Sequence, residues 1–242
     1  AYFRRNLMPG MLGWFQMRPE TSIEDVEWLL ARSAGFEAGF AFVTSYDSLD
    51  KNGATDAILK AIGRWERARL AGVFSDDQKR RMQDIGNEFH LEENASGTRL
   101  LTQIHSFKFR YEEGDRKPGE HAVSMFPFRN PVEDRVLQFI LTAVDAEASE
   151  IRLGRVGSAG IALPVRLKPG WSIQYLGGTV ATLYDPGWHK TAEVPINQDR
   201  MTLAPGEHKL SFTCRFSGRT KPGAKPALKI EVRIPGRPEA VG

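Results

Sequence analysis

Two apolar runs of strand length stand near the N-terminus, and a helical pattern lies between them. The runs are MLGWFQM at residues 11–17 and AGFAFVTS at residues 38–45. Between them, Thr21 and Glu24 stand at capping-box spacing, and Gly35 marks the predicted end of the helix. An unbroken apolar strand bordered by helices is typical of a parallel sheet that is covered on both faces. These residues therefore predict a strand–helix–strand unit.

Two more helices are predicted before residue 95. In residues 50–72, Ile58, Ile62 and Trp65 share one helix face through their i, i+4, i+7 spacing. In residues 75–93, Ser75 and Gln78 stand at capping-box spacing and begin a polar helix. The charge of this last helix indicates that it is not central to the core.

From about residue 98 the apolar positions alternate with polar ones. The alternation is clearest in HSFKFRYEEG at residues 105–114, HKLSFTCRFSG at residues 208–218 and LKIEVRIPG at residues 228–236. Strands with one buried face, separated by Gly/Pro turns, predict an antiparallel sandwich or jelly roll. Cys214 falls on an apolar face, so we expect a buried core thiol.

The sequence WSIQYLGGTVATLYD at residues 171–185 predicts a hairpin. A two-residue loop of Gly177 and Gly178 would pair Trp171 with Tyr184. One face of the hairpin would then hold the residues Trp171, Ile173, Tyr175, Val180, Thr182 and Tyr184. Two interpretations are open: this face packs into the core, or some of its rings form a platform for sugar rings.

Composition and motifs exclude several classes of function. The 33 basic residues are scattered among 30 acidic ones, so no concentrated basic face favours nucleic acid. No apolar stretch reaches the ~18 residues of a membrane helix, and the N-terminus lacks the apolar core of a signal peptide. A single cysteine and five dispersed histidines predict no disulfide, metal site or cofactor. GRVGSAG at residues 154–160 has the wrong spacing for a nucleophile elbow.

Residues 4–45, from RRNLMPG to FAFVTS, resemble the last two βα units of the (β/α)8 barrels in bacterial glycoside hydrolase-like proteins. In those barrels a strand carrying LGWF precedes a helix of the EDVEWLLARSAGF kind and a strand ending in FAF. LAPGEHKLSF at residues 203–212 resembles turn-to-strand passages of their C-terminal accessory domains. The resemblance implies an α+β multidomain chain. Residues 1–95 would be terminal βα units of an α/β barrel, and residues 96–242 a jelly-roll-like antiparallel β-sandwich.

The resemblance also implies where a ligand would bind, because residues that follow barrel strands face the active-site mouth. These residues are Gln16, Arg18 and Glu20 after the first strand, and Thr44, Ser45, Tyr46 and Asp47 after the second. Glu20 and Asp47 are the candidate catalytic carboxylates, and each also fits a structural role at a helix start or loop. Trp188 and His189 are further ligand-binding candidates. A Trp beside a Pro-Gly turn folds back onto the sandwich, meets a ligand or contacts a partner chain.

The implied function is that of the C-terminal portion of a carbohydrate-active, glycoside hydrolase-like protein, secreted or periplasmic in a bacterium. Its sandwich would bind sugar or give structural support. The mid-barrel strands that usually carry the two glycosidase carboxylates are absent, so we expect no turnover from this chain alone. Either a cleaved N-terminal part or a partner chain would supply the rest of the barrel, or this region would fold differently and pack on the sandwich. The alternatives are an interaction module that binds no sugar and a hydrolase with an atypical site.

Overall fold

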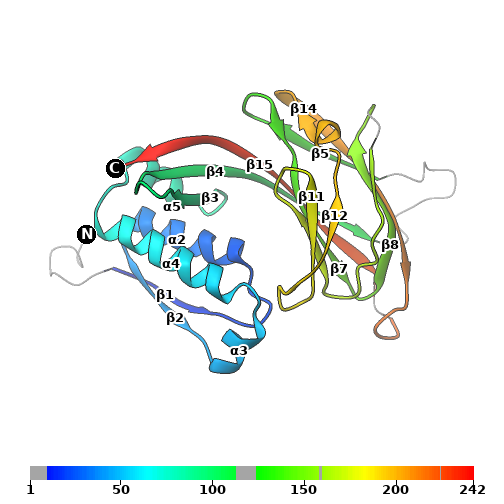
Figure 1. The fold of residues 1–242 in the computed structure, drawn as a ribbon, viewed down its shortest axis with the longest axis horizontal. Helices are drawn as coiled ribbons and strands as arrows, with labels where there is room; N and C mark the ends of the chain where they lie inside the picture. Colours follow the sequence, from blue (N-terminus) through cyan, green and yellow to red (C-terminus); the bar gives the residue numbers. More distant parts are fainter. Residues whose placement is uncertain (1–9, 113–123, 158–159, 224) are drawn as a thin grey trace. The chain divides into compact units, whose positions relative to one another are not determined.

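The chain divides into two compact units in a computed structural model that describes residues 10–112, 124–157, 160–223 and 225–242 (Figure 1). The first unit comprises Ala1–His105, Gly187–His189 and Gly236–Gly242, and the second comprises Ser106–Pro186 and Lys190–Pro235. The first unit therefore extends beyond the expected boundary at residue 95 and takes in two later segments. Residues 4–9 of the segment that resembles a barrel lie outside the described residues.

The expected barrel is wrong. Strands β1 (Met11–Gln16) and β2 (Gly39–Val43) pair in parallel as a two-stranded sheet and are joined through helix α2 (Ile23–Phe36). About 47% of the residues are in strands and 22% in helices, and the other strand pairs with a described register are antiparallel. The local strand–helix–strand signal is real, but it specifies one crossover and not the number of strands that a sheet contains.

In the first unit, α2 and α4 (Thr55–Leu70) lie between two layers of strands (Figure 1). One layer is the β1–β2 pair. The other contains β3 (Glu88–Glu93) with the parts of β4 (Arg99–Glu112) and β15 (Ala227–Val241) that belong to this unit. The face predicted for α4 is confirmed, because Ile58 and Trp65 are fully buried and Ile62 packs against the same core. Helix α3 (Tyr46–Lys51) follows β2, and α5 (Asp76–Gln83) packs against α2.

The N-cap of α2 lies one residue beyond the predicted position, and its C-cap lies two residues beyond it. Ser22 is the N-cap, and its Oγ accepts the Asp25 N–H at 3.0 Å, while Thr21 Oγ1 accepts the Arg18 N–H at 2.9 Å. The helix passes through Gly35 and ends at Phe36, and its C-cap Glu37 has a left-handed φ of 51°. The capping box predicted for α5, Ser75 with Gln78, is confirmed, but the helix ends at Gln83. The prediction of a helix through residue 93 is wrong, because Glu88–Glu93 form strand β3.

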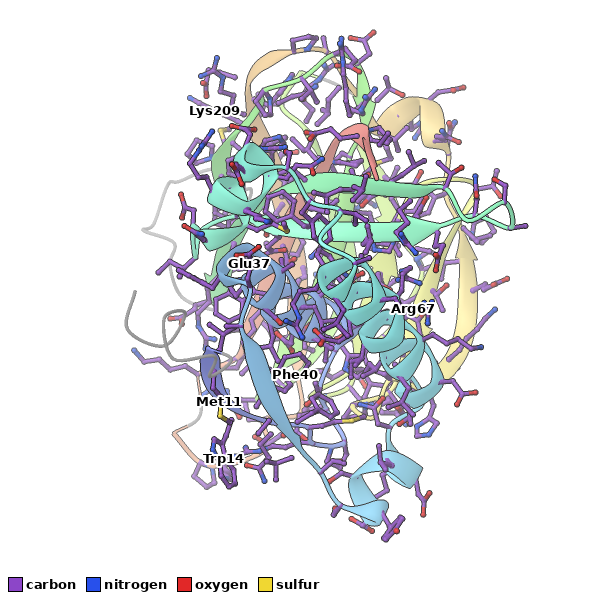
Figure 2. The ribbon with its side chains drawn as sticks, turned by 90° about the vertical axis from the view of Figure 1, so that its left-hand side faces the viewer. Met11, Trp14, Glu37, Phe40, Arg67 and Lys209 are labelled. Atoms are coloured by element: carbon purple, nitrogen blue, oxygen red, sulfur yellow. The ribbon has the colours of Figure 1, made fainter. Side chains whose placement is uncertain are left out.

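Among the described residues the β1–β2 pair is covered on one side only, which differs from the predicted burial of both faces. Phe15 and Phe42 stack with their ring centroids 5.7 Å apart and pack against the helical core. Met11 is 59% exposed and Trp14 is 81% exposed, and both project outward from β1 (Figure 2). Within the described residues no helix is long and apolar enough to cross a membrane.

The second unit contains two facing antiparallel sheets (Figure 1). One contains β7 (Gln138–Val144), β10 (Ser172–Tyr175), β11 (Val180–Tyr184) and β12 (Lys190–Pro195), and β7 also pairs with β15. The other contains β5 (Ser124–Asn130), β8 (Glu147–Arg155), β9 (Ile161–Leu163) and β14 (Gly206–Ser217). The short strands β6 (Arg135–Val136) and β13 (Thr202–Leu203) form a separate pair.

The predicted alternation in this unit is confirmed. Inward side chains of both sheets form one core, which includes Phe212 and Cys214 from β14 and Ile230 and Val232 from β15. Cys214 is 9% exposed, as expected for a core thiol. These strands were predictable because each has one buried and one solvent-facing side.

The register predicted for the hairpin is wrong by one residue. Ser172, not Trp171, pairs with Tyr184, so the loop also includes Thr179. A one-residue shift moves every side chain of the second strand to the opposite face of the sheet. Ile173 and Tyr175 consequently share their buried face with Ala181 and Leu183, and the continuous aromatic face does not form.

Candidate ligand-binding sites

The residues expected at a barrel mouth follow the carboxyl ends of β1 and β2, which lie at one edge of the parallel pair. Gln16 is the last residue of β1, and Arg18 Nη2 lies 3.5 Å from its Oε1. The Glu20 carbonyl accepts the indole N–H of Trp188 at 2.8 Å. Three segments predicted to contribute to a site, residues 16–20, 44–47 and 187–189, therefore belong to the first unit.

The side chain of Asn52 connects the loop after β1 to the start of α4, and the sequence analysis did not identify this residue. Its buried side chain donates to the carbonyls of Pro19 at 2.9 Å and Thr21 at 2.8 Å, and its Oδ1 accepts the Ala54 N–H at 2.8 Å. The Asn-Gly pair at residues 52–53 is a turn signal in the sequence, but such a signal does not reveal distant partners.

Two glycines fix the position of residues 187–189. The Gly53 N–H donates to the Gly187 carbonyl at 2.7 Å. A Cβ on Gly187 would lie 2.6 Å from the Lys51 carbonyl oxygen, and one on Gly53 would lie 2.7 Å from the Trp188 carbonyl oxygen. Both distances are too short for any larger residue, so the close backbone approach requires glycine at both positions.

The candidate side chains at this edge are mostly exposed. Tyr46 is 88% exposed, His189 is exposed and Trp188 is half-buried with a left-handed φ of 61°. Asp47 lies in the first turn of α3 and forms an ion pair with Lys51 at 2.8 Å, which is the structural role that competes with catalysis. The catalytic role of Glu20 and Asp47 and the ligand-binding role of the other residues stay predictions.

A cavity of about 370 Å³ lies over the outer face of β8, β9 and β14 in the second unit. Its lining residues are Arg152, Leu153, Gly160, Ile161, Ala162, Arg200, Ser211, Phe212 and Thr213. Arg152 pairs across the strands with Ala162 on one side and Thr213 on the other, so these three side chains share the outer face. The apolar lining residues Leu153, Ile161 and Phe212 belong to the core below.

Two glycines shape one wall of this cavity. A Cβ on Gly154 would lie 2.5 Å from the Gly160 Cα, so the connection between β8 and β9 lies directly against β8. Ser211, opposite Gly154 on β14, donates its hydroxyl to the Gly154 carbonyl at 3.0 Å. The sequence GRVGSAG, which fails as a nucleophile elbow, thus supplies glycines for close packing; its residues 158 and 159 lie outside the described residues.

Arg200 enters the cavity from another element, the 3-10 helix η1 (Gln198–Met201). The buried Met201 anchors this helix in the core, and Arg200 Nη1 donates to the Gly160 carbonyl at 3.2 Å. Sequence analysis could have placed Arg152 and Thr213 on the polar side of alternating strands. It could not have placed Arg200 beside them, because that contact depends on the order of strands and loops in space.

A second cavity of about 260 Å³, in the first unit, is polar and lies beside a buried carboxylate. Its lining residues are Arg64, His90, Glu92, Glu93, Asn94, Thr98 and Leu100. Behind them, Glu27 accepts the Trp65 indole N–H at 3.1 Å, lies 2.7 Å from His90 Nδ1 and lies 3.6 Å from Arg64 Nη2.

The charges in this cluster compensate one another. Burial alone would lower the pKa of His90, but the hydrogen bond and charge of Glu27, together with Glu92, raise it above the ordinary value. Glu93 forms ion pairs with Arg67 at 3.0 Å and Arg99 at 3.1 Å. Across the described ranges, no group of three or more His, Cys, Asp or Glu side chains is placed to hold a metal ion. These contacts indicate a structural ion-pair network.

The chain matches no family model, no curated protein and no solved structure.

Proposed function

We propose that the second unit is a carbohydrate-binding sandwich that holds its ligand in the cavity over β8, β9 and β14. The observation that carries the proposal is the composition of this cavity. Two guanidinium groups, the hydroxyls of Ser211 and Thr213 and the exposed methyl of Ala162 line the outer side of the sheet, while the side chains of Leu153, Ile161 and Phe212 point away into the core and contribute only backbone. Ligand sites are typically concave and equipped with a few convergent polar groups.

A sugar ring fits this combination chemically. One side of a pyranose presents C–H groups that pack on apolar surface, while its hydroxyls need donors and acceptors at the rim. The volume of about 370 Å³ lies near the lower end of the ~300–1,000 Å³ range of small-molecule sites, which suits a short saccharide segment.

The same composition favours binding over hydrolysis. Most glycosidases place two carboxylates on either side of the scissile bond. The described lining of the cavity contains no Asp or Glu. We therefore propose a binding module and expect no turnover of glycosides at this cavity.

Filling the cavity tests the proposal. Ala162 is an exposed lining residue, so Ala162→Trp should block the cavity with little change in the free energy of unfolding. Retardation of the protein in native gels containing dissolved polysaccharides, neutral and acidic, should be abolished by this substitution. Ser217→Trp is the matched control, because Ser217 is an exposed small residue of the same sheet and neither it nor its cross-strand partner Glu147 lines the cavity. Retardation that survives Ala162→Trp would contradict the proposed site.

The interaction-module alternative has its own supporting observation, the exposed apolar side chains of Met11 and Trp14 on β1. Contiguous exposed apolar groups often mark protein contacts. If no polysaccharide in the panel retards the protein, this alternative is favoured over carbohydrate binding.

A further inference from the structure

We infer that the ligand of the β8–β9–β14 cavity is an anionic saccharide, whose acidic group binds between Arg152 and Arg200. The inference rests on the proposed function and names the ligand class of the same cavity. Three features support it: the charges in the cavity, the hydrogen bonds of its two arginines, and the ion pairs that neighbouring arginines form outside it.

Two guanidinium groups reach one cavity from separate elements. Arg152 projects from the outer face of β8, and Arg200 comes from η1. The described lining contains no acidic side chain, so the cavity has two formal positive charges of its own. A concave site with charge of one sign concentrates ions of the opposite sign, so this cavity favours an anion.

Each arginine has donors left for a ligand. A guanidinium has five N–H donors, and Arg200 uses one of them on the Gly160 carbonyl. The backbone of Arg152 belongs to the sheet, but in the described part of the chain its guanidinium forms no hydrogen bond or ion pair with another residue. Guanidinium groups bind planar carboxylates through two parallel hydrogen bonds, and they bind sulfate and phosphate oxygens in a similar way.

Neighbouring arginines in the same unit are different, because each already has a carboxylate. Arg215 Nε lies 3.1 Å from Glu150 Oε2, Arg129 Nε lies 3.7 Å from Glu207 Oε1, and Arg166 Nη1 lies 3.4 Å from Glu147 Oε1. These three arginines outside the cavity thus have acidic partners, whereas the described lining offers none to Arg152 and Arg200. This difference distinguishes a binding site from a generally basic surface.

The remaining polar groups fit a sugar and not a free inorganic anion. Ser211 already donates its hydroxyl hydrogen to the Gly154 carbonyl, so its oxygen is an acceptor for a ligand hydroxyl. Thr213 lies beside Arg152 in the cross-strand row and supplies a second hydroxyl. The site therefore combines recognition of an acidic group with recognition of hydroxyls on the same molecule.

Isothermal titration with three matched ligands tests the inference on the full chain. The ligands are oligogalacturonate, the same oligosaccharide with its carboxyl groups reduced to alcohols, and a sulfated neutral oligosaccharide of equal length. We expect the carboxylated or the sulfated ligand to bind at least tenfold more tightly than the reduced one, because hydrogen bonds to charged groups are the stronger ones. Preference for carboxylate or for sulfate identifies the acidic group.

Arg152→Met and Arg200→Met should each weaken binding of the preferred anionic ligand by about tenfold or more and leave binding of the reduced ligand unchanged. Arg215→Met is the matched control, because it removes a charge from the same sheet outside the cavity, and it should have no effect. Arg152→Lys keeps the charge but removes the bidentate fork, so it should restore only part of the affinity.

The outcomes separate this inference from the proposed function. Equal affinity for reduced and anionic ligands, abolished by Ala162→Trp, would overturn the inference and leave carbohydrate binding in place. An equal loss of affinity for the anionic ligand in Arg215→Met and Arg152→Met would overturn it as well, because the ligand would then be attracted by the positive charge of the whole surface and not by this cavity. If none of the three ligands binds and no polysaccharide retards the protein, both proposals are wrong.

Discussion

Glu27 is a buried carboxylate whose three partners all come from elements of the first unit. Trp65 and Arg64 on α4 and His90 on β3 contact it directly. A buried charge is costly unless it is paired and hydrogen-bonded, so Glu27 makes the positions of α4 and β3 interdependent. His90 is the titratable member of this set near neutral pH.

Replacing His90 should change the pH dependence of stability. The pKa of His90 is raised in the folded protein, because Glu27 and Glu92 outweigh the effect of burial. A histidine with a raised pKa contributes stability that is fully present below its unfolded value of ~6.5 and is lost as the pH rises through its folded value. Urea denaturation should therefore show that His90→Asn is most destabilising near pH 5.5 and less so at pH 9.

His105 provides a control of opposite sign. Burial lowers the pKa of His105, so its contribution is present above ~pH 6.5 and is lost as the pH falls through the folded value. The free energy of unfolding of His105→Asn should therefore rise relative to that of the parent protein as the pH decreases. The same pH trend in both variants would contradict the assignment to Glu27.

At the scale of elements, local patterns predicted α2, α4 and α5 but fewer than half of the described strands, and they placed the residues of β3 in a helix. Alternation on β14 and β15 and the apolar face of α4 were readable because each element has one side in a core. The register of the hairpin could not be read from the sequence. Its loop contains a third residue, Thr179, and this places the side chains of β11 on the opposite faces from those predicted. Thr21 and Ser22 both fit a cap, and the contact of Thr21 with Arg18 decides between them.

The candidate sites were predictable to the same extent. The residues after β1 and β2 could be grouped because parallel neighbours end at one edge. Asn52, which orders that edge, and Arg200, which completes the cavity, act through partners distant in sequence. No periodicity encodes such contacts.

Two helical glycines should respond oppositely to the same substitution. A Cβ on Gly35 of α2 would lie 2.9 Å from the Met82 carbonyl carbon, whereas one on Gly63 of α4 meets only the flexible end of Arg67 at 3.3 Å. Gly35→Ala should reduce the free energy of unfolding by about 1–3 kcal/mol through overpacking. Gly63→Ala should increase it by about 0.5–1 kcal/mol, because alanine favours the helix.

Urea denaturation of both variants gives the measurement, and each serves as the control for the other. A gain in stability for Gly35→Ala would mean that α2 and α5 are packed less closely than the structure describes.

At the scale of the whole molecule, the chain returns to its first unit at the very end. Val241 is buried in the helical core of that unit, and Gln78 Nε2 lies 3.5 Å from the Ala240 carbonyl oxygen. Glu239 forms an ion pair with Arg81 on α5. The sequence shows a change of period near residue 98, but nothing in GRPEAVG at residues 236–242 indicates that these residues belong with the N-terminal helices.

Ending the chain after Pro235 should therefore destabilise the first unit selectively. The truncation removes the buried side chain of Val241. Full burial of a residue of this size contributes about 1.5–3 kcal/mol to the free energy of unfolding, so the loss of Val241 by itself accounts for destabilisation of about that size. Hydrogen exchange should accelerate at amides of α2, α4 and β3 and stay slow in β8 and β14. Glu239→Gln removes only the partly exposed ion pair, so it should cost less than about 1 kcal/mol. Equal acceleration in both units would show that they unfold as one cooperative body, and unchanged exchange in α2 and α4 would show that residues 236–242 do not support the helical core.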